Sequence, residues 1–227
     1  MARPSRGSET PSTRKRGRSG GAPARPPRRG VPWRPTREQI AAAAGRTVPD
    51  VVADRLAVLF CGINPSLYSG AVRHHFARPG NRFWPVLHGA GFTDRLLTPF
   101  EEDELLARGV GVTNLVARAT ASAAELTRDE LRRGARVLAA KVRRHRPAIV
   151  AFLGIEAYRH AFARKDAKLG EQPERLEGAR VWVLPNPSGL NAHYQLPELV
   201  RIYRELAEAA GLLERDAQAL RRSRAAR

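Results

Sequence analysis

Short apolar runs alternate with segments of helical periodicity along the middle of the chain. The runs at 56–60, 148–153 and 180–184 are rich in Val, Leu, Ile and Phe over the length of one strand, as is typical of strands buried on both faces of a parallel sheet. Segment 109–120 predicts a further short strand followed by a loop. Strands that alternate with helices predict an α/β sandwich with a mostly parallel sheet.

Helix signals fill the stretches between these runs. Thr127 and Glu130 form a capping box ahead of the clearest apolar stripe. The predicted helices cover 36–44, 82–91, a short segment opening at Pro99, 127–146, 154–162 and 196–213. Residues 164–178 are polar and predict an irregular surface connection. A loop of roughly 20 residues is predicted between the first strand and the helix at Arg82, and loops of that length are usually functional or disordered.

Charge is distributed unevenly over the 227 residues. Residues 1–37 hold eleven Lys/Arg and one acid, whereas 38–213 hold 24 basic and 19 acidic residues, a net charge of +5. The first segment cannot bury a core, so we expect a disordered basic arm, a single folded domain over 38–213 and a basic tail over 214–227. Cationic arms favour a polyanionic partner. A solubilising tail without a partner is the alternative.

Cysteine usage and hydropathy exclude other classes. Cys61 is the only cysteine, which excludes disulfides and cysteine-based zinc sites and is typical of a small core residue in a reducing compartment. No run approaches the ~18 apolar residues of a membrane span, and no hydrophobic signal core follows the basic start. We therefore expect a cytoplasmic protein with no membrane partner.

Two loops carry the same dipeptide at the ends of predicted strands. Asn64-Pro65 follows the first strand in GINPS, and Asn186-Pro187 follows the last in NPSGLN. Proline fixes its own φ and restricts the residue before it, which holds each amide in one direction. A single Asn-Pro pair is more typical of a turn. Two of them at the carboxyl edge of one parallel sheet, where ligands bind, favour a shared site.

Four motifs in order resemble one family. GINPS (62–66), HHFARPGNRFW (74–84), GVTNLVARAT (111–120) and NPSGL (186–190) are similar to the mismatch-specific uracil and thymine DNA glycosylases, the G:U and G:T mismatch family of the uracil-DNA glycosylase superfamily. The resemblance runs from about residue 56 to 206. It implies a three-layer α/β/α sandwich around a four-stranded parallel sheet, with no metal and no cofactor. It also implies hydrolysis of the N-glycosidic bond of a flipped pyrimidine in double-stranded DNA. We expect the protein to be a monomer associated with the nucleoid.

The resemblance assigns roles residue by residue. Asn64 is the expected catalytic residue, because its amide oxygen can orient a water towards C1′ of the deoxyribose, and Thr120 is expected to help hold that water. The expected base-binding residues are Ile63, Ser69, Phe76 and Asn114. Phe76 would stack on the base, whereas its alternative is ordinary packing beneath the loop.

The last motif implies contacts with the DNA helix. Leu190 is the expected apolar wedge, with Gly189 allowing close approach to the backbone and Asn191 contacting the guanine left unpaired. The alternative for Leu190 is a core position at the start of the last helix. The remaining motif residues are expected to support the pocket: Pro65, Ser66, His75, Asn81, Asn186 and Ser188. For His74 and His75, pocket lining or phosphate contact is favoured over metal ligation, because adjacent side chains diverge.

Three departures qualify the resemblance. Ser66 stands where a glycine is typical, which puts the substrate range in doubt, and the AHYQ sequence after Asn191 does not match the usual basic residue of the wedge loop. No Asp follows the first strand, which argues against the general uracil-excising branches. Two alternatives stay open: a catalytically weak DNA-binding protein that senses lesions with the same pocket, and a nonspecific nucleic-acid binder dominated by its arms.

Overall fold

The computed structural model describes residues 31–189 and 191–214. The basic arm up to residue 30, the tail after residue 214 and the proposed wedge Leu190 lie outside the described residues. The elements, in chain order, are α1 (Arg37–Ala41), β1 (Val58–Gly62), α2 (Leu67–Val72), α3 (Phe83–Ala90), the 3-10 helix η1 (Pro99–Arg108), β2 (Val110–Asn114), η2 (Ala123–Glu125), α4 (Arg128–His145), β3 (Ile149–Leu153), α5 (Ile155–Phe162), β4 (Gly170–Leu176), β5 (Ala179–Leu184) and α6 (Leu196–Ala209). No helix within these ranges is long and apolar enough to cross a bilayer.

The sheet has the order β2-β1-β3-β5-β4, with its first four strands parallel. The expected mostly parallel sheet is thus confirmed, but it has five strands rather than four. The additional strand is β4, which pairs antiparallel with β5 inside the segment predicted to be irregular. It was missed because an edge strand faces solvent, and β4 is correspondingly polar and carries Pro173.

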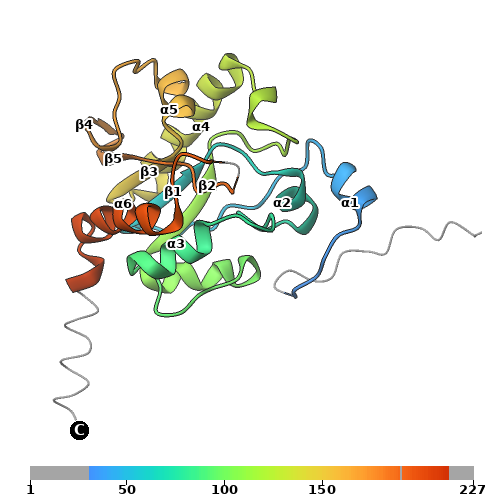
Figure 1. The fold of residues 1–227 in the computed structure, drawn as a ribbon. Helices are drawn as coiled ribbons and strands as arrows, with labels where there is room; N and C mark the ends of the chain where they lie inside the picture. Colours follow the sequence, from blue (N-terminus) through green and yellow to red (C-terminus); the bar gives the residue numbers. More distant parts are fainter. Residues whose placement is uncertain (1–30, 190, 215–227) are drawn as a thin grey trace, which may run out of the picture.

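Two helical layers enclose the sheet (Figure 1). On one face, Phe60 and Leu184 belong to a core shared with α3 and α6; on the other, Phe152 and Val183 pack with α4 and α5. This division follows from the alternation of side chains along a strand. The apolar runs are therefore buried on both sides, and the three-layer α/β/α prediction is confirmed.

Two details at β1 differ from the prediction. The strand continues through Cys61 to Gly62, and Cys61 is buried, where burial raises the pKa of its thiol and keeps it protonated. The loop that follows is not irregular throughout, because the short helix α2 interrupts it with Ser66 as its N-cap. The consequence is that Asn64 and Pro65 occupy a tight connection between a strand end and a helix start.

Candidate active site

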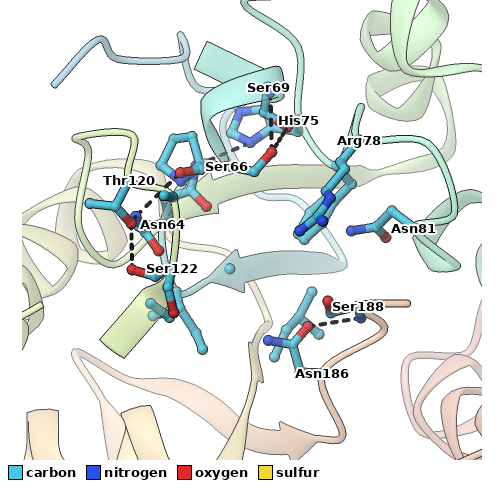
Figure 2. A pocket seen from close by; sticks show the side chains of 18 residues that line it. Asn64, Ser66, Ser69, His75, Arg78, Asn81, Thr120, Ser122, Asn186 and Ser188 are labelled. Atoms are coloured by element: carbon cyan, nitrogen blue, oxygen red, sulfur yellow. Dashed lines mark hydrogen bonds between the residues drawn. The ribbon is translucent and has the colours of Figure 1, made fainter. Parts of the chain in front are cut away.

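A cavity of about 240 Å³ opens at the carboxyl edge of the parallel strands (Figure 2). Its lining residues come from the ends of strands, the two Asn-Pro loops, helix α2, the α2–α3 segment and the segment after β2: Gly62, Ile63, Asn64, Pro65, Ser66, Ser69, His75, Phe76, Arg78, Asn81, Asn114, Thr120, Ala121, Ser122, Ala123, Leu153, Asn186 and Ser188. The cavity is smaller than pockets for drug-sized ligands, which span ~300–1,000 Å³. The predicted convergence of the two loops on one site is therefore present in the structure.

The Asn64 amide is held in one orientation by three oxygen atoms. Its Nδ2 donates to Oγ1 of Thr120 at 2.7 Å, to the carbonyl of Arg118 at 3.1 Å and to the carbonyl of Pro65 at 3.2 Å. Because carbonyl oxygens only accept, nitrogen must face them. The carbonyl oxygen Oδ1 accepts no hydrogen bond from the described residues and is left for a ligand.

The hydroxyl group of Thr120 helps to orient the Asn64 amide. Its hydroxyl donates to the carbonyl of Ser122 at 2.8 Å, so the oxygen presents a lone pair to Asn64. Its backbone N–H donates to the Pro65 carbonyl at 3.1 Å, which joins the two loops. Thr120 therefore orients Asn64 in this structure, and its expected role in holding water stays a prediction.

Ser66 and Ser69 form the start of α2. The Ser66 hydroxyl accepts from the backbone N–H of Ser69 at 3.2 Å and donates to the Ser69 hydroxyl, also at 3.2 Å. The Ser69 oxygen additionally accepts from the N–H of Ala77 at 3.1 Å. The hydroxyl of Ser66 is thus used as a helix cap, which is a support role of the kind expected for it.

Phe76 lies on the cavity wall with a strained backbone. Its φ is 51°, a left-handed value that is uncommon for a bulky residue. The ring stacks on Phe83 of α3 at a centroid distance of 4.0 Å with an interplanar angle of 23°. Phe76 therefore packs against the core and also lines the cavity, and its stacking on a base stays a prediction.

His75 fixes the orientation of Asn114. The Nε2 atom of His75 lies 3.0 Å from the carbonyl of Pro49, so it carries a proton and donates, and a neutral ring then accepts at Nδ1 from Asn114 Nδ2 at 3.3 Å. With its nitrogen directed to His75, Asn114 directs its Oδ1 towards Gly62. A Cβ added at Gly62 would lie 2.6 Å from that oxygen. An amide set in this way can accept a hydrogen bond from a ligand N–H.

Behind the cavity, His74 and His75 share one buried carboxylate. His74 Nδ1 donates to Oε1 of Glu102 at 2.8 Å, and the backbone N–H of His75 donates to Oε2 at 2.8 Å. Burial acts to raise the pKa of the Glu102 carboxyl, but the hydrogen bonds that it accepts from the His74 ring and from the His75 backbone outweigh burial and hold the pKa below its usual range. This pairing could not be anticipated from the sequence, because Glu102 comes from the distant η1 segment.

Replacing Glu102 by alanine is expected to lower the free energy of unfolding by about 3 kcal/mol, because it removes the charged acceptor of two buried hydrogen bonds. The stabilisation requires the charged carboxylate, so it is present above a pH of about 4.3 and is lost as the pH falls through the lowered folded-state pKa. Thermal unfolding of both proteins across this range checks the prediction. Glu104→Ala removes an exposed carboxylate paired with Arg95, and it should lower the free energy of unfolding by less than about 1 kcal/mol. Equal decreases for the two variants would show that Glu102 has no special role in stability.

The far wall of the cavity contains two further amides. Asn81 Oδ1 accepts from the backbone N–H of Phe83 at 2.9 Å, and Asn186 Oδ1 accepts from that of Ser188 at 3.0 Å. Each amide oxygen is thus bound to the backbone, and the nitrogen of Asn81 points to the cavity in Figure 2. The two Asn residues and Ser188 line the cavity as predicted from the motifs.

Gly189 and Asn191 do not line the cavity. A Cβ at Gly189 would lie 2.5 Å from the carbonyl oxygen of Gly80, so this glycine allows close approach to the protein's own backbone. Asn191 Nδ2 donates to the Asn186 carbonyl at 3.0 Å, and Asn191 Oδ1 accepts from the N–H of His193 at 3.2 Å. Both residues therefore shape the loop between β5 and α6, and their proposed contacts with DNA stay predictions.

Two polar residues of the cavity lining, Arg78 and Ser122, were not among the predicted site residues. Arg78 lines the cavity and is the single charged residue among its lining residues, none of which is acidic. It stands inside the HHFARPGNRFW motif, where its position offered the only signal. Ser122 contributes the carbonyl that binds the Thr120 hydroxyl. The site therefore holds amides, hydroxyls and one cation, which can orient a water and bind a polar ring but offer no carboxylate as a base.

Within residues 31–189 and 191–214, no three His, Cys, Asp or Glu side chains are grouped so as to hold a metal ion. A family model described as the uracil DNA glycosylase superfamily matches residues 49–207. The structure is similar to a solution NMR structure described as a "putative Uracil DNA glycosylase" from Methanosarcina acetivorans, with 19% sequence identity and a TM-score of 0.50 over 71% of this chain and 98% of that chain. At this identity the likeness shows a shared fold.

Proposed function

The chain belongs to the uracil DNA glycosylase superfamily, and we propose that it hydrolyses the N-glycosidic bond of uracil mispaired with guanine in duplex DNA. Membership of the superfamily indicates a DNA glycosylase, a hydrolase that acts on DNA. The mismatch preference, the route through a flipped base and the role of each residue are our proposal. We further propose that thymine or ethenocytosine opposite guanine are secondary substrates, and that the enzyme works as a cytoplasmic monomer at the nucleoid.

The observation that carries this proposal is the orientation of Asn64. Three acceptors hold its nitrogen, and the remaining oxygen faces a cavity that has no carboxylate among its lining residues. An amide oxygen can accept a hydrogen bond from a water and direct the lone pair of that water at C1′, but it cannot take the proton at neutral pH. Positioning of the nucleophile is therefore the main contribution of Asn64, and we expect a slow enzyme.

The departing base needs stabilisation as the bond breaks. Asn114 Oδ1 can accept the N3–H of uracil, because His75 holds the amide nitrogen away from it. The backbone N–H groups of Ile63 and Phe76 donate to no other described residue and can bind the oxygens of the leaving pyrimidine, where negative charge develops. Arg78 adds the positive charge of the cavity mouth. Each of these groups acts on the base, whereas Asn64 acts on the water.

A mismatch preference follows from the cost of base flipping. Extrusion of a base loses stacking and pairing worth a few kcal/mol, and the loss is smallest for a mispaired base. An enzyme that gains little from acid–base chemistry therefore acts first on bases that are cheap to flip. Ser69 would lie near C5 of the bound ring, where its small side chain decides whether a thymine methyl group fits.

The proposal is tested by single-turnover excision on a panel of duplexes. We expect uracil to be released fastest from G:U, more slowly from A:U, and thymine or ethenocytosine from G:T and G:ethenocytosine at lower rates still. Chromatography of the released base measures each rate with enzyme in excess, and single-stranded uracil completes the panel. Equal rates on G:U and A:U would overturn the mismatch preference.

A rival function uses the same cavity to bind DNA lesions without excising a base. The protein would then bind lesions in DNA and hold them for other enzymes. This reading predicts tight binding of G:U duplexes with no free uracil after hours at high enzyme excess. The oriented amide of Asn64 favours hydrolysis, because lesion sensing does not require a free oxygen directed by three hydrogen bonds.

A further inference from the structure

The side chain of Arg82 binds backbone carbonyl groups of the β5–α6 loop, residues 185–195. Its guanidinium donates to the carbonyls of Tyr194 at 2.5 Å, Ser188 at 2.6 Å and Asn191 at 2.9 Å, with a longer bond of 3.4 Å to Pro187. The backbone N–H of Arg82 also donates to the Pro187 carbonyl at 3.0 Å. The loop is therefore fixed at points on both sides of residues 189–190 by one side chain.

The geometry requires arginine in particular. A guanidinium presents five donors in a rigid planar fork, whereas lysine offers a single charged atom that cannot reach carbonyls on both limbs of a loop. Arg82 is half-buried and forms no ion pair with a carboxylate of the described residues. Its charge is met by carbonyl dipoles instead, and such charge-assisted bonds are stronger than neutral ones.

Two other contacts seat the same loop. The hydroxyl of Tyr203, a buried residue of α6, donates to the Pro185 carbonyl at 2.9 Å. Gly189 packs against the backbone of Gly80, two residues before Arg82. The loop is thus docked on the segment that also carries Asn81, and this segment and the loop together form one wall of the cavity.

We propose that Arg82 is a positioning residue for base binding, and this proposal rests on the proposed function. The loop that it holds carries Asn186 and Ser188, which line the cavity, while Arg82 itself does not. Asn64 is held separately, by Thr120 and the Arg118 carbonyl. Loss of the Arg82 bonds should therefore displace the wall that contacts the nucleotide and leave the group that orients water in place.

The kinetic test uses full-length Arg82→Lys and Arg82→Met in single-turnover excision on a G:U duplex. We expect the half-saturating enzyme concentration to rise about tenfold or more, because two or more charge-assisted bonds are lost, while the plateau rate stays within about threefold of wild type. Arg201→Lys is the matched control, because Arg201 is exposed on α6 and pairs only with Glu205 among the described residues. A plateau rate that falls while half-saturation stays constant would overturn the proposal.

A second measurement needs no DNA. Hydrogen–deuterium exchange of the free protein should be about tenfold faster or more in a peptide covering residues 186–195 of Arg82→Lys, and unchanged around Asn64 and in Arg201→Lys. Unchanged exchange in the loop would refute the positioning role. If wild type releases no uracil, the proposed function fails, whereas the exchange result still decides whether Arg82 positions the loop.

Discussion

Replacing Asn64 by alanine is expected to lower the single-turnover rate of uracil excision at least about 10³-fold, while the affinity for G:U duplex changes little. The reason is that the amide oxygen is proposed to orient the attacking water, and loss of such positioning removes a large part of the rate. The cavity walls that are proposed to bind the base come from other residues, chiefly Phe76 and Asn114, which line the cavity. Excision assays at enzyme excess and duplex binding by fluorescence anisotropy measure the two effects separately.

Thermal unfolding is the control for this variant, because the Asn64 nitrogen makes three hydrogen bonds in the folded state. A variant that is folded at the assay temperature, binds the duplex and releases no uracil supports the assigned role. Excision within tenfold of wild type by folded Asn64→Ala would show that another group directs the water.

The second large effect is expected for Gly62→Ala at the end of β1. A Cβ at this position would lie 2.6 Å from Asn114 Oδ1 and 3.1 Å from Cζ of Phe76. The added methyl group must therefore displace two groups that are proposed to bind the base. Because a displacement of about 1 Å near a reacting group can cost 10²-fold, we expect excision to fall by about that factor.

Gly111→Ala is the matched control for this change. Gly111 lies on the neighbouring strand β2, where a Cβ would meet Leu56 Cδ1 at 2.5 Å and the Val51 carbonyl oxygen at 2.6 Å, both outside the cavity. This variant should lose stability but excise uracil at close to the wild-type rate while it is folded. If both glycine variants lose activity only in proportion to their loss of stability, the groups that a Cβ at Gly62 would displace do not act in base binding.

The sequence predicted the parallel strands because burial on both faces requires uninterrupted apolar runs, as in β3. It also predicted the start of α4, because the capping box of Thr127 and Glu130 is a local signal that the structure reproduces. The edge strand β4 was not predicted, since its polar residues carry no such pattern. Helix α2 is only six residues long, too short for apolar periodicity to show.

The lining of the cavity could be anticipated because the motifs that carry it lie at strand ends, and parallel strands bring such ends together. The residues that hold these lining residues in place could not be anticipated. Glu102 meets His74 and His75 through packing of η1, and Arg82 meets Ser188 and Asn191 from far along the chain. Pairings of this kind depend on tertiary structure and leave no local pattern.

The most direct test of the central claim is a time course of free uracil released from a G:U duplex by excess full-length protein, with the product strand analysed by mass spectrometry. We expect one uracil per duplex and an intact strand that carries a single abasic site, because water is the proposed nucleophile. A duplex that is bound for hours and yields neither free uracil nor an abasic site would contradict it.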